Sequence, residues 1–152
     1  MKDMKEWIQV ELDTEKLKQA KHLRGIVVEL LVSPYDVPEA VRGFFDDEIN
    51  RFAIEFKYIG GSDEPKKNNQ QDKYLNFKIG ENSERLYRLE IDVAALQANT
   101  VGLMIVQKEV NEALDQLIQQ SGRINRKDNY RLAKEAIVAR TDQLFSGLAQ
   151  AA

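Results

Sequence analysis

The chain of 152 residues is 43% hydrophobic and 31% charged, and its formal net charge at pH 7 is −3. This length suits a single domain with its own core, and this composition excludes disorder along the whole chain. The small excess of acids disfavours wholesale binding to nucleic acid or to an anionic membrane.

The chain contains no cysteine, which excludes disulfides, thiolate metal ligands and cysteine nucleophiles. Its N-terminus mixes charged and apolar residues and lacks the apolar segment of a signal peptide. The longest apolar run, IVVELLV, is too short to span a bilayer. We therefore expect a cytoplasmic protein that does not enter a membrane.

Three segments precede the first proline. Residues 8–12 alternate apolar and polar side chains, which indicates a short strand, although neighbouring residues would equally suit a small helical stripe. Residues 13–22 predict a polar helical turn or two, with Asp13 as the N-cap. Residues 23–33 are nearly continuously apolar and rich in β-branched side chains, so they predict a central strand covered on both faces.

The segment GFFDDEINRF, residues 43–52, is compatible with two local structures. In one, residues 36–50 form a helix that starts with a capping-box spacing around Pro38. In the other, residues 46–50 form the turn of a β-hairpin. Gly43 would cost a helix about 1 kcal/mol relative to alanine, and the strong strand pattern that follows also favours the hairpin.

Residues 51–59 have the strongest strand pattern of the chain, with aromatic and aliphatic side chains on one face. Residues 73–93 repeat this pattern twice around the turn residues GENS, which predicts a second hairpin. The connection over 60–73 is polar and has no periodicity. It predicts a flexible loop without regular structure.

Apolar residues step by three and four along 101–120, which predicts an amphipathic helix ending at Ser121-Gly122. A second helix is expected from an Asp128 cap onward, with a weak point at Arg140 and Thr141. Two helices joined by a short loop would form a helical hairpin.

The expected fold class is α+β. A mostly antiparallel β-sheet of about four or five strands is followed by a C-terminal two-helix hairpin that packs on its apolar face. Residues 1–152 are expected to form one domain, with the sheet within 1–99 and the helices within 100–152.

The three consecutive acids Asp46, Asp47 and Glu48 lack the alternate spacing and the glycine of a calcium-binding loop. We interpret them as the polar end of a turn. Alternation also places further charged residues on the outward face of the sheet, where opposite charges predict cross-strand pairing more than a cation site. These residues are Glu55, Lys57, Lys78, Arg88, Glu90 and Asp92.

The other usual signs of a catalytic or cofactor site are weak. His22 is the only histidine, so a zinc site with several histidines is excluded, and its cationic neighbours favour a surface position. Trp7, the only tryptophan, could stack on a ligand, but a lone tryptophan near a terminus more often packs as a lid on the core, as we expect here. No phosphate-binding glycine pattern and no nucleophile elbow occurs. The sequence thus predicts no catalytic residue, no cofactor and no metal ligand.

The segment SGRINRKDNYR, 121–131, is the strongest basic cluster. A basic loop before a helix would grip phosphates, and an aromatic ring in it would stack on a base. The alternative is an exposed loop whose cations complement the C-terminus of the first helix. The candidate nucleic-acid contacts are Arg123, Arg126, Lys127, Tyr130 and Arg131.

The apolar seam of the two helices is a candidate interface with a protein partner or with a second copy of the chain. Its residues are Leu103, Val106, Val110, Leu114, Leu117, Ile137, Leu144 and Leu148. Our first hypothesis is therefore a non-enzymatic interaction module that forms a homodimer through its C-terminal helices. The alternatives are a nucleic-acid-associated regulator that uses 121–131 and a small metal-dependent enzyme built on carboxylates such as Asp46, Asp47, Glu55 and Glu90.

Overall fold

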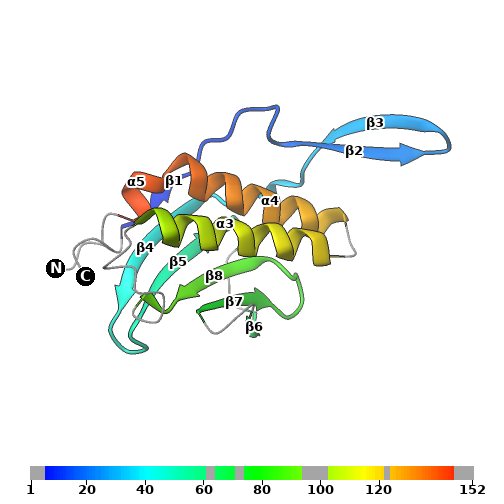
Figure 1. Cartoon of the computed structure of the whole chain (residues 1–152). Coiled ribbons are helices and arrows are strands. Elements are labelled where there is room, and N and C mark those ends of the chain that lie inside the picture. The colour runs from blue at the N-terminus through cyan, green and yellow to red at the C-terminus, as the bar shows by residue number, and fades with distance from the viewer. Residues whose placement is uncertain (1–5, 61–63, 71–73, 94–102, 122–123, 146–152) are drawn as a thin grey trace.

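The computed structural model describes residues 6–60, 64–70, 74–93, 103–121 and 124–145, and the side chains of these residues except 20–23, 103–105 and 124–125. Within this part the fold is α+β, with two antiparallel sheets and two long helices (Figure 1). The larger sheet has six strands, which is more than the sequence predicted. Its spatial order is β1 (Ile8–Gln9), β4 (Ala40–Asp46), β5 (Arg51–Lys57), β8 (Leu86–Ile91), β7 (Leu75–Gly80) and β6 (Lys66–Gln70).

The smaller sheet contains only β2 (Lys18–Leu23) and β3 (Ile26–Leu31). A short 3-10 helix at Pro34–Asp36 connects it to β4. The helical part consists of α3 (Leu103–Gln120), α4 (Ile124–Ala139) and the single turn α5 (Thr141–Leu144).

The hairpin interpretation of GFFDDEINRF is confirmed, because β4 and β5 are antiparallel and pair from Ala40 with Lys57 to Asp46 with Arg51. In the turn between them, the Asp46 carboxylate accepts a hydrogen bond of 3.0 Å from the main-chain N–H of Glu48. Asn50 closes the turn at a φ of 57°, a conformation that asparagine tolerates better than most residues.

The second predicted hairpin is also confirmed as β7 and β8, with one irregularity. Lys78 lies opposite Arg88 and Ile79 lies opposite Leu86, so Tyr87 has no partner of its own in the register. Such a bulge redirects a side chain. Tyr87 is nevertheless buried with the core cluster, where its ring packs edge-on against that of Tyr58 with the ring centres 5.3 Å apart.

The prediction of a structureless loop over 60–73 is wrong for Lys66–Gln70, which form the edge strand β6. The sequence KKNNQ has few residues that favour strands, so its side chains gave no signal. Its main chain pairs with β7 along the whole strand, from Lys66 opposite Gly80 to Gln70 opposite Asn76. Lysine on an edge strand also hinders pairing with further chains.

Two predictions near the N-terminus are wrong. Residues 18–22, expected to be helical, belong to strand β2, although Asp13 does accept a hydrogen bond of 3.2 Å from the Lys16 N–H in the turn before it. The apolar run in 23–33 does form a strand, β3, but this strand is not central: it pairs only with β2, and five of its six residues are exposed.

The first helix agrees with its prediction, whereas the second starts earlier than expected. Because α4 begins at Ile124, Asp128 lies inside the helix and is not its N-cap. The predicted weak point is real: α4 ends at Ala139, and α5 begins at Thr141.

One cluster of buried side chains draws members from β4, β5, β7 and β8 and also from α3, α4 and α5. Figure 1 shows α3 and α4 side by side on one side of the large sheet. Gly43 of β4 lies close to α5, because a Cβ atom at this position would be 2.5 Å from the Leu144 carbonyl oxygen. Next to this contact the rings of Phe52 and Phe145 stack with their centres 5.9 Å apart.

Candidate functional site

Strands β2 and β3 form a two-stranded ribbon, residues 18–31, that projects away from the rest of the protein (Figure 1). We call this ribbon the arm. Only Arg24 and Gly25 separate the paired residues Leu23 and Ile26 at its end. Both turn residues have positive φ, 49° and 84°, as the tightest hairpin turns require.

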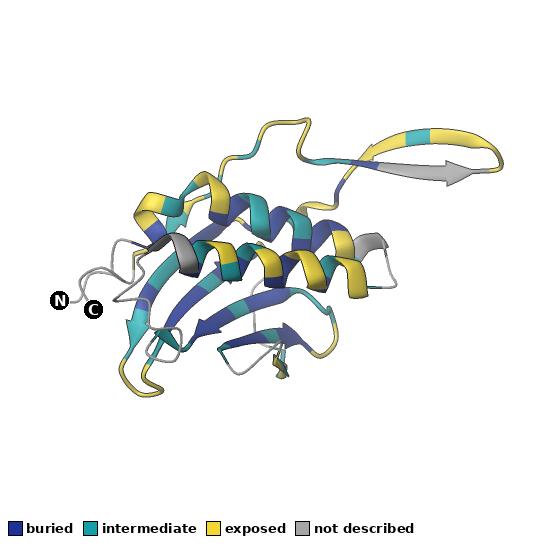
Figure 2. Ribbon diagram, viewed as in Figure 1, coloured by how far each residue is buried: buried dark blue, intermediate teal, exposed yellow. Residues whose placement is uncertain are grey.

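Strand β3 of the arm is mostly exposed (Figure 2), and several of its exposed side chains are large and apolar. The exposed fractions on β3 are 64% for Ile26, 58% for Val27, 43% for Leu30 and 62% for Leu31. Because neighbouring residues of a strand point to opposite faces, these four side chains cover both faces of the ribbon. A two-stranded hairpin by itself is only marginally stable in water, so this surface is suited to contact with another molecule.

The base of the arm is fixed to helix α4. The Arg131 guanidinium donates hydrogen bonds to the carbonyl oxygens of Lys16, at 2.7 Å, and of Lys18, at 3.3 Å. The same guanidinium contacts the Asp128 carboxylate at 3.1 Å, and the Gln19 amide donates to the other oxygen of that carboxylate. Gln19 and Asp128 are both buried, so the bond between them is shielded from water, whereas the bonds of Arg131 are only partly buried or exposed.

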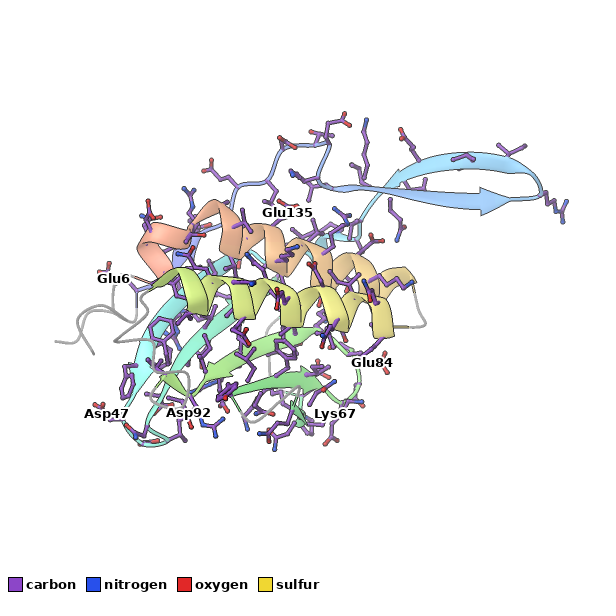
Figure 3. The ribbon with its side chains drawn as sticks, viewed as in Figure 1. Glu6, Asp47, Lys67, Glu84, Asp92 and Glu135 are labelled. Atoms are coloured by element: carbon purple, nitrogen blue, oxygen red, sulfur yellow. The ribbon has the colours of Figure 1, made fainter. Side chains whose placement is uncertain are left out.

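A surface ion pair supports the same attachment. The Lys16 ammonium lies 3.2 Å from the carboxylate of Glu135, one turn further along α4 than Arg131. Figure 3 labels Glu135. An exposed pair of this kind contributes little by itself. The buried Gln19–Asp128 bond and the main-chain bonds of Arg131 therefore account for most of the attachment.

The charge of the arm differs in sign from that of the remainder of the chain. Residues 18–31 contain Lys18, Lys21, Arg24 and Glu29, a formal charge of +2, which leaves −5 on all other residues. The arm is thus a basic and apolar element on an acidic protein, and it favours contact with an acidic surface.

The predicted helix interface is buried within the chain itself. Leu103 lies at the start of α3, and Leu148 lies outside the described residues. The six other seam residues are at most 4% exposed: Val106, Val110, Leu114, Leu117, Ile137 and Leu144. In this conformation they contact the chain's own core and offer no surface to a second chain.

The predicted basic cluster is also engaged within the chain. Arg126 pairs with Glu84 at 2.9 Å, and the buried Tyr130 hydroxyl donates to the Glu84 carbonyl oxygen at 2.8 Å. Burial raises the pKa of Tyr130 to about 12. Arg131 holds the arm, as described above, and Arg123 lies outside the described residues. Of the candidates whose side chains are described, Lys127 alone is exposed.

The acids of GFFDDEINRF do not form a separate site. Asp47 and Glu48 are exposed at the end of the β4–β5 hairpin, where Figure 3 labels Asp47. Asp46 is half-buried and lies 2.5 Å from the Arg88 guanidinium.

Arg88 gathers two more carboxylates, those of Glu55 at 2.9 Å and Glu90 at 3.1 Å. Arg42 binds Glu55 from the other side at 2.6 Å. The carboxylates named for a metal-dependent enzyme are thus arranged around guanidinium groups, as the predicted salt-bridged face requires. Among the described residues there is no group of three or more histidine, cysteine or acidic side chains placed to hold a metal ion.

Searches against protein-family models, curated proteins and solved structures found no match to this chain. No helix in the described part of the chain is long and apolar enough to cross a membrane. The role of the arm is therefore inferred from its own geometry, exposure and charge. The sequence contains one signal for the arm, because Arg24-Gly25 separates two segments that can pair. The apolar composition of β3 instead predicts a place in the core.

Proposed function

We propose that the protein is a non-enzymatic interaction module that self-associates through the arm. From the sequence alone, the apolar seam of the two C-terminal helices is the first candidate for the interface with a partner. The burial of this seam instead supports a structural role, in which α3 and α4 close the apolar face of the chain's own sheet. Among the described residues, the arm then carries four of the eight exposed large apolar side chains.

The observation that carries this proposal is the exposure of Ile26, Val27, Leu30 and Leu31 on a ribbon with a fixed base. Apolar side chains on both faces of a thin projection cannot be buried by a small adjustment of the same chain. Burying them against a partner removes them from water, at roughly 25 cal/mol for each Å² of apolar surface. Fixing the base in advance lowers the entropy lost on binding.

Charge favours a second copy as that partner. A basic arm and an acidic remainder on one chain are complementary between two copies. In a twofold dimer each copy would place its arm on the other, so the buried area of one contact is doubled. We propose such a reciprocal dimer.

The test is sedimentation equilibrium of the full chain, with arm variants that retain strand-forming residues. Val27→Thr with Leu31→Thr makes one face of β3 polar, and Ile26→Thr with Leu30→Thr does so for the other. The matched control is Ile59→Thr with Val138→Thr, because these side chains are 57% and 50% exposed outside the arm. Circular dichroism of each variant checks that the fold is retained.

We expect a dimer whose dissociation constant rises at least about tenfold in the arm variants and stays unchanged in the control, since tenfold corresponds to 1.4 kcal/mol. Added salt should weaken the wild-type dimer, because screening reduces the attraction between the arm and the acidic remainder. A wild-type chain that is monomeric at all accessible concentrations would overturn the proposal, as would arm variants that associate like the wild type.

A further inference from the structure

A hollow of about 370 Å³ lies on the large sheet, on the face that carries Arg42, Glu55 and Arg88. This volume falls in the range of sites that hold small molecules. Besides these three residues, its lining includes Lys66, Lys78, Trp7 and Tyr87.

The floor of the hollow is a row of directly opposed residues that crosses the sheet from β4 to β7, and the row continues beyond the hollow to β6. Arg42 lies opposite Glu55, Glu55 opposite Arg88, Arg88 opposite Lys78, and Lys78 opposite Asn68. Opposed residues on neighbouring strands have their Cβ atoms about 5 Å apart, so the row brings its charges together.

The ion pairs of this row gather around its two guanidinium groups. Glu55 accepts from both Arg42 and Arg88, and Arg88 also contacts Asp46 and Glu90, as described above. Lys78 faces Arg88, a like charge, and within the described part of the chain it forms no ion pair. The Lys78 ammonium therefore remains available to a bound anion, which would also offset its repulsion by the like charge of Arg88.

Lys66 adds a second ammonium group on the same side. It belongs to β6, pairs with Gly80, and is thus diagonal to Lys78. Its ammonium lies 4.8 Å from the centre of the Tyr87 ring, so that ring and cation form one wall of the hollow. The bulge in β8 explains why Tyr87 reaches this face, because the residue is left out of the register between Leu86 and Arg88.

Trp7 forms the opposite wall. The Arg42 guanidinium lies 4.1 Å from the centre of its ring and thereby fixes the ring over the β4 end of the row. Between the two walls the hollow combines aromatic surface with the ammonium of Lys78, which has no ion-pair partner among the described residues.

We propose that this hollow binds a small organic anion, in which a carboxylate or phosphate contacts Lys66 and Lys78 while a planar apolar group lies against Trp7. The shared chemistry is an oxyanion joined to a flat ring. This inference is independent of the arm, and neither result depends on the other.

Trp7 supplies the measurement, because it is the only tryptophan of the chain and lies in the wall of the site. The probes are phenyl phosphate and benzoate, which carry both parts, with inorganic phosphate and phenol as the separate parts. We expect the two combined probes to change the Trp7 fluorescence saturably at lower concentration than either part alone. The stronger of the two identifies phosphate or carboxylate as the preferred group.

Lys78→Gln and Lys66→Gln should each weaken binding of the better probe about tenfold or more, the usual effect of a lost charge-assisted hydrogen bond. Lys108→Gln is the matched control, because it removes the same charge from an exposed position on α3. Lys78→Gln should also leave the melting temperature equal or higher, since it removes a like charge opposite Arg88.

Three results would overturn the proposal. The first is fluorescence that none of the probes changes at millimolar concentration. The second is equal binding by Lys78→Gln and the Lys108→Gln control. The third is a linear response without saturation, which would indicate quenching by collision and no site.

Discussion

The side-chain amide of Asn129 replaces a backbone partner for Leu86, because its oxygen accepts the Leu86 N–H at 3.0 Å. Its nitrogen donates to the Asp36 carbonyl at 2.8 Å and to the Tyr58 hydroxyl at 3.0 Å, and that hydroxyl donates to the Leu86 carbonyl at 2.7 Å. Burial raises the pKa of the Tyr58 hydroxyl, which keeps it a donor. One buried amide thus joins α4 to the start of β8 and to the segment before β4.

We predict that Asn129→Leu lowers the free energy of unfolding by about 2 to 4 kcal/mol, because it leaves buried polar groups of the main chain without partners. Chemical denaturation monitored by circular dichroism measures this change. Lys127→Ala, two residues earlier on the same helix and exposed, is the control and should change stability by less than about 0.5 kcal/mol. A loss for Asn129→Leu no larger than that of the control would contradict the role assigned to the amide.

The role of Asn129 could not be predicted from the sequence, whereas several elements of the fold could. The β4–β5 and β7–β8 hairpins and helix α3 could be predicted, because their burial follows a period of two or of three to four residues. Asn129 lies in a helix and has no such signal. Its partners are 43 and more residues away, so only the folded arrangement identifies it.

The predictions for strands β3 and β6 are wrong for opposite reasons. An apolar run predicts that β3 is covered, but it does not say whether the cover is the chain's own core or another molecule. Strand β6 is polar, so its side chains predicted a loop, whereas main-chain pairing with β7 and the bonds of Glu64 place it at the sheet edge. The arm and the hollow both depend on these two strands, so neither site could be predicted from the sequence.

Glu64 precedes β6 in the chain, and its carboxylate binds the turn between β7 and β8. It accepts hydrogen bonds from the N–H groups of Asn82, at 2.8 Å, and Ser83, at 2.9 Å, and from the hydroxyls of Ser83 and Tyr87. Burial opposes its charged form, but the hydrogen bonds together outweigh burial and lower the pKa of Glu64 from 4.5 to about 2. Its stabilising effect is therefore complete above pH 4.5 and is lost as the pH falls toward 2.

We predict that Glu64→Gln is less stable than the wild type at pH 7 and that the difference between them disappears as the pH falls from 4.5 to 2. Thermal unfolding across this range measures the difference. Glu81→Gln, at an exposed position in the same turn, should differ from the wild type by a small amount that does not follow this curve. A Glu64→Gln deficit that is constant between pH 7 and pH 2 would contradict a pKa lowered by these bonds.

The grouping of three carboxylates around Arg88 leads to a separate prediction. Arg88→Met leaves Asp46, Glu55 and Glu90 close together without their shared cation, although Arg42 still holds Glu55. We expect a loss of about 2 kcal/mol, which is less than for a fully buried pair because these side chains remain partly exposed to solvent. Lys57→Met, at an exposed position of the same sheet, is the control.

A double-mutant cycle distinguishes charge from packing in this group. If repulsion among the acids causes the loss, Asp46→Asn should cost less in the Arg88→Met background than in the wild type. Additive effects of the two substitutions would show instead that Arg88 acts through its packing alone.

The turn of the arm gives the last prediction. Arg24 adopts a φ of 49°, which costs most side chains about 1 to 2 kcal/mol and costs asparagine less. Arg24→Asn should therefore stabilise the ribbon by about 1 kcal/mol and slow hydrogen exchange of its cross-strand amides about fivefold. Gly25→Ala should accelerate the same exchange, because alanine is strained at a φ of 84°. Amides of β5 and β8 are the internal reference and should not change, since β2 and β3 pair only with each other. Equal changes in the arm and in the large sheet would show that the two unfold as one unit, which contradicts an arm that is attached only at its base.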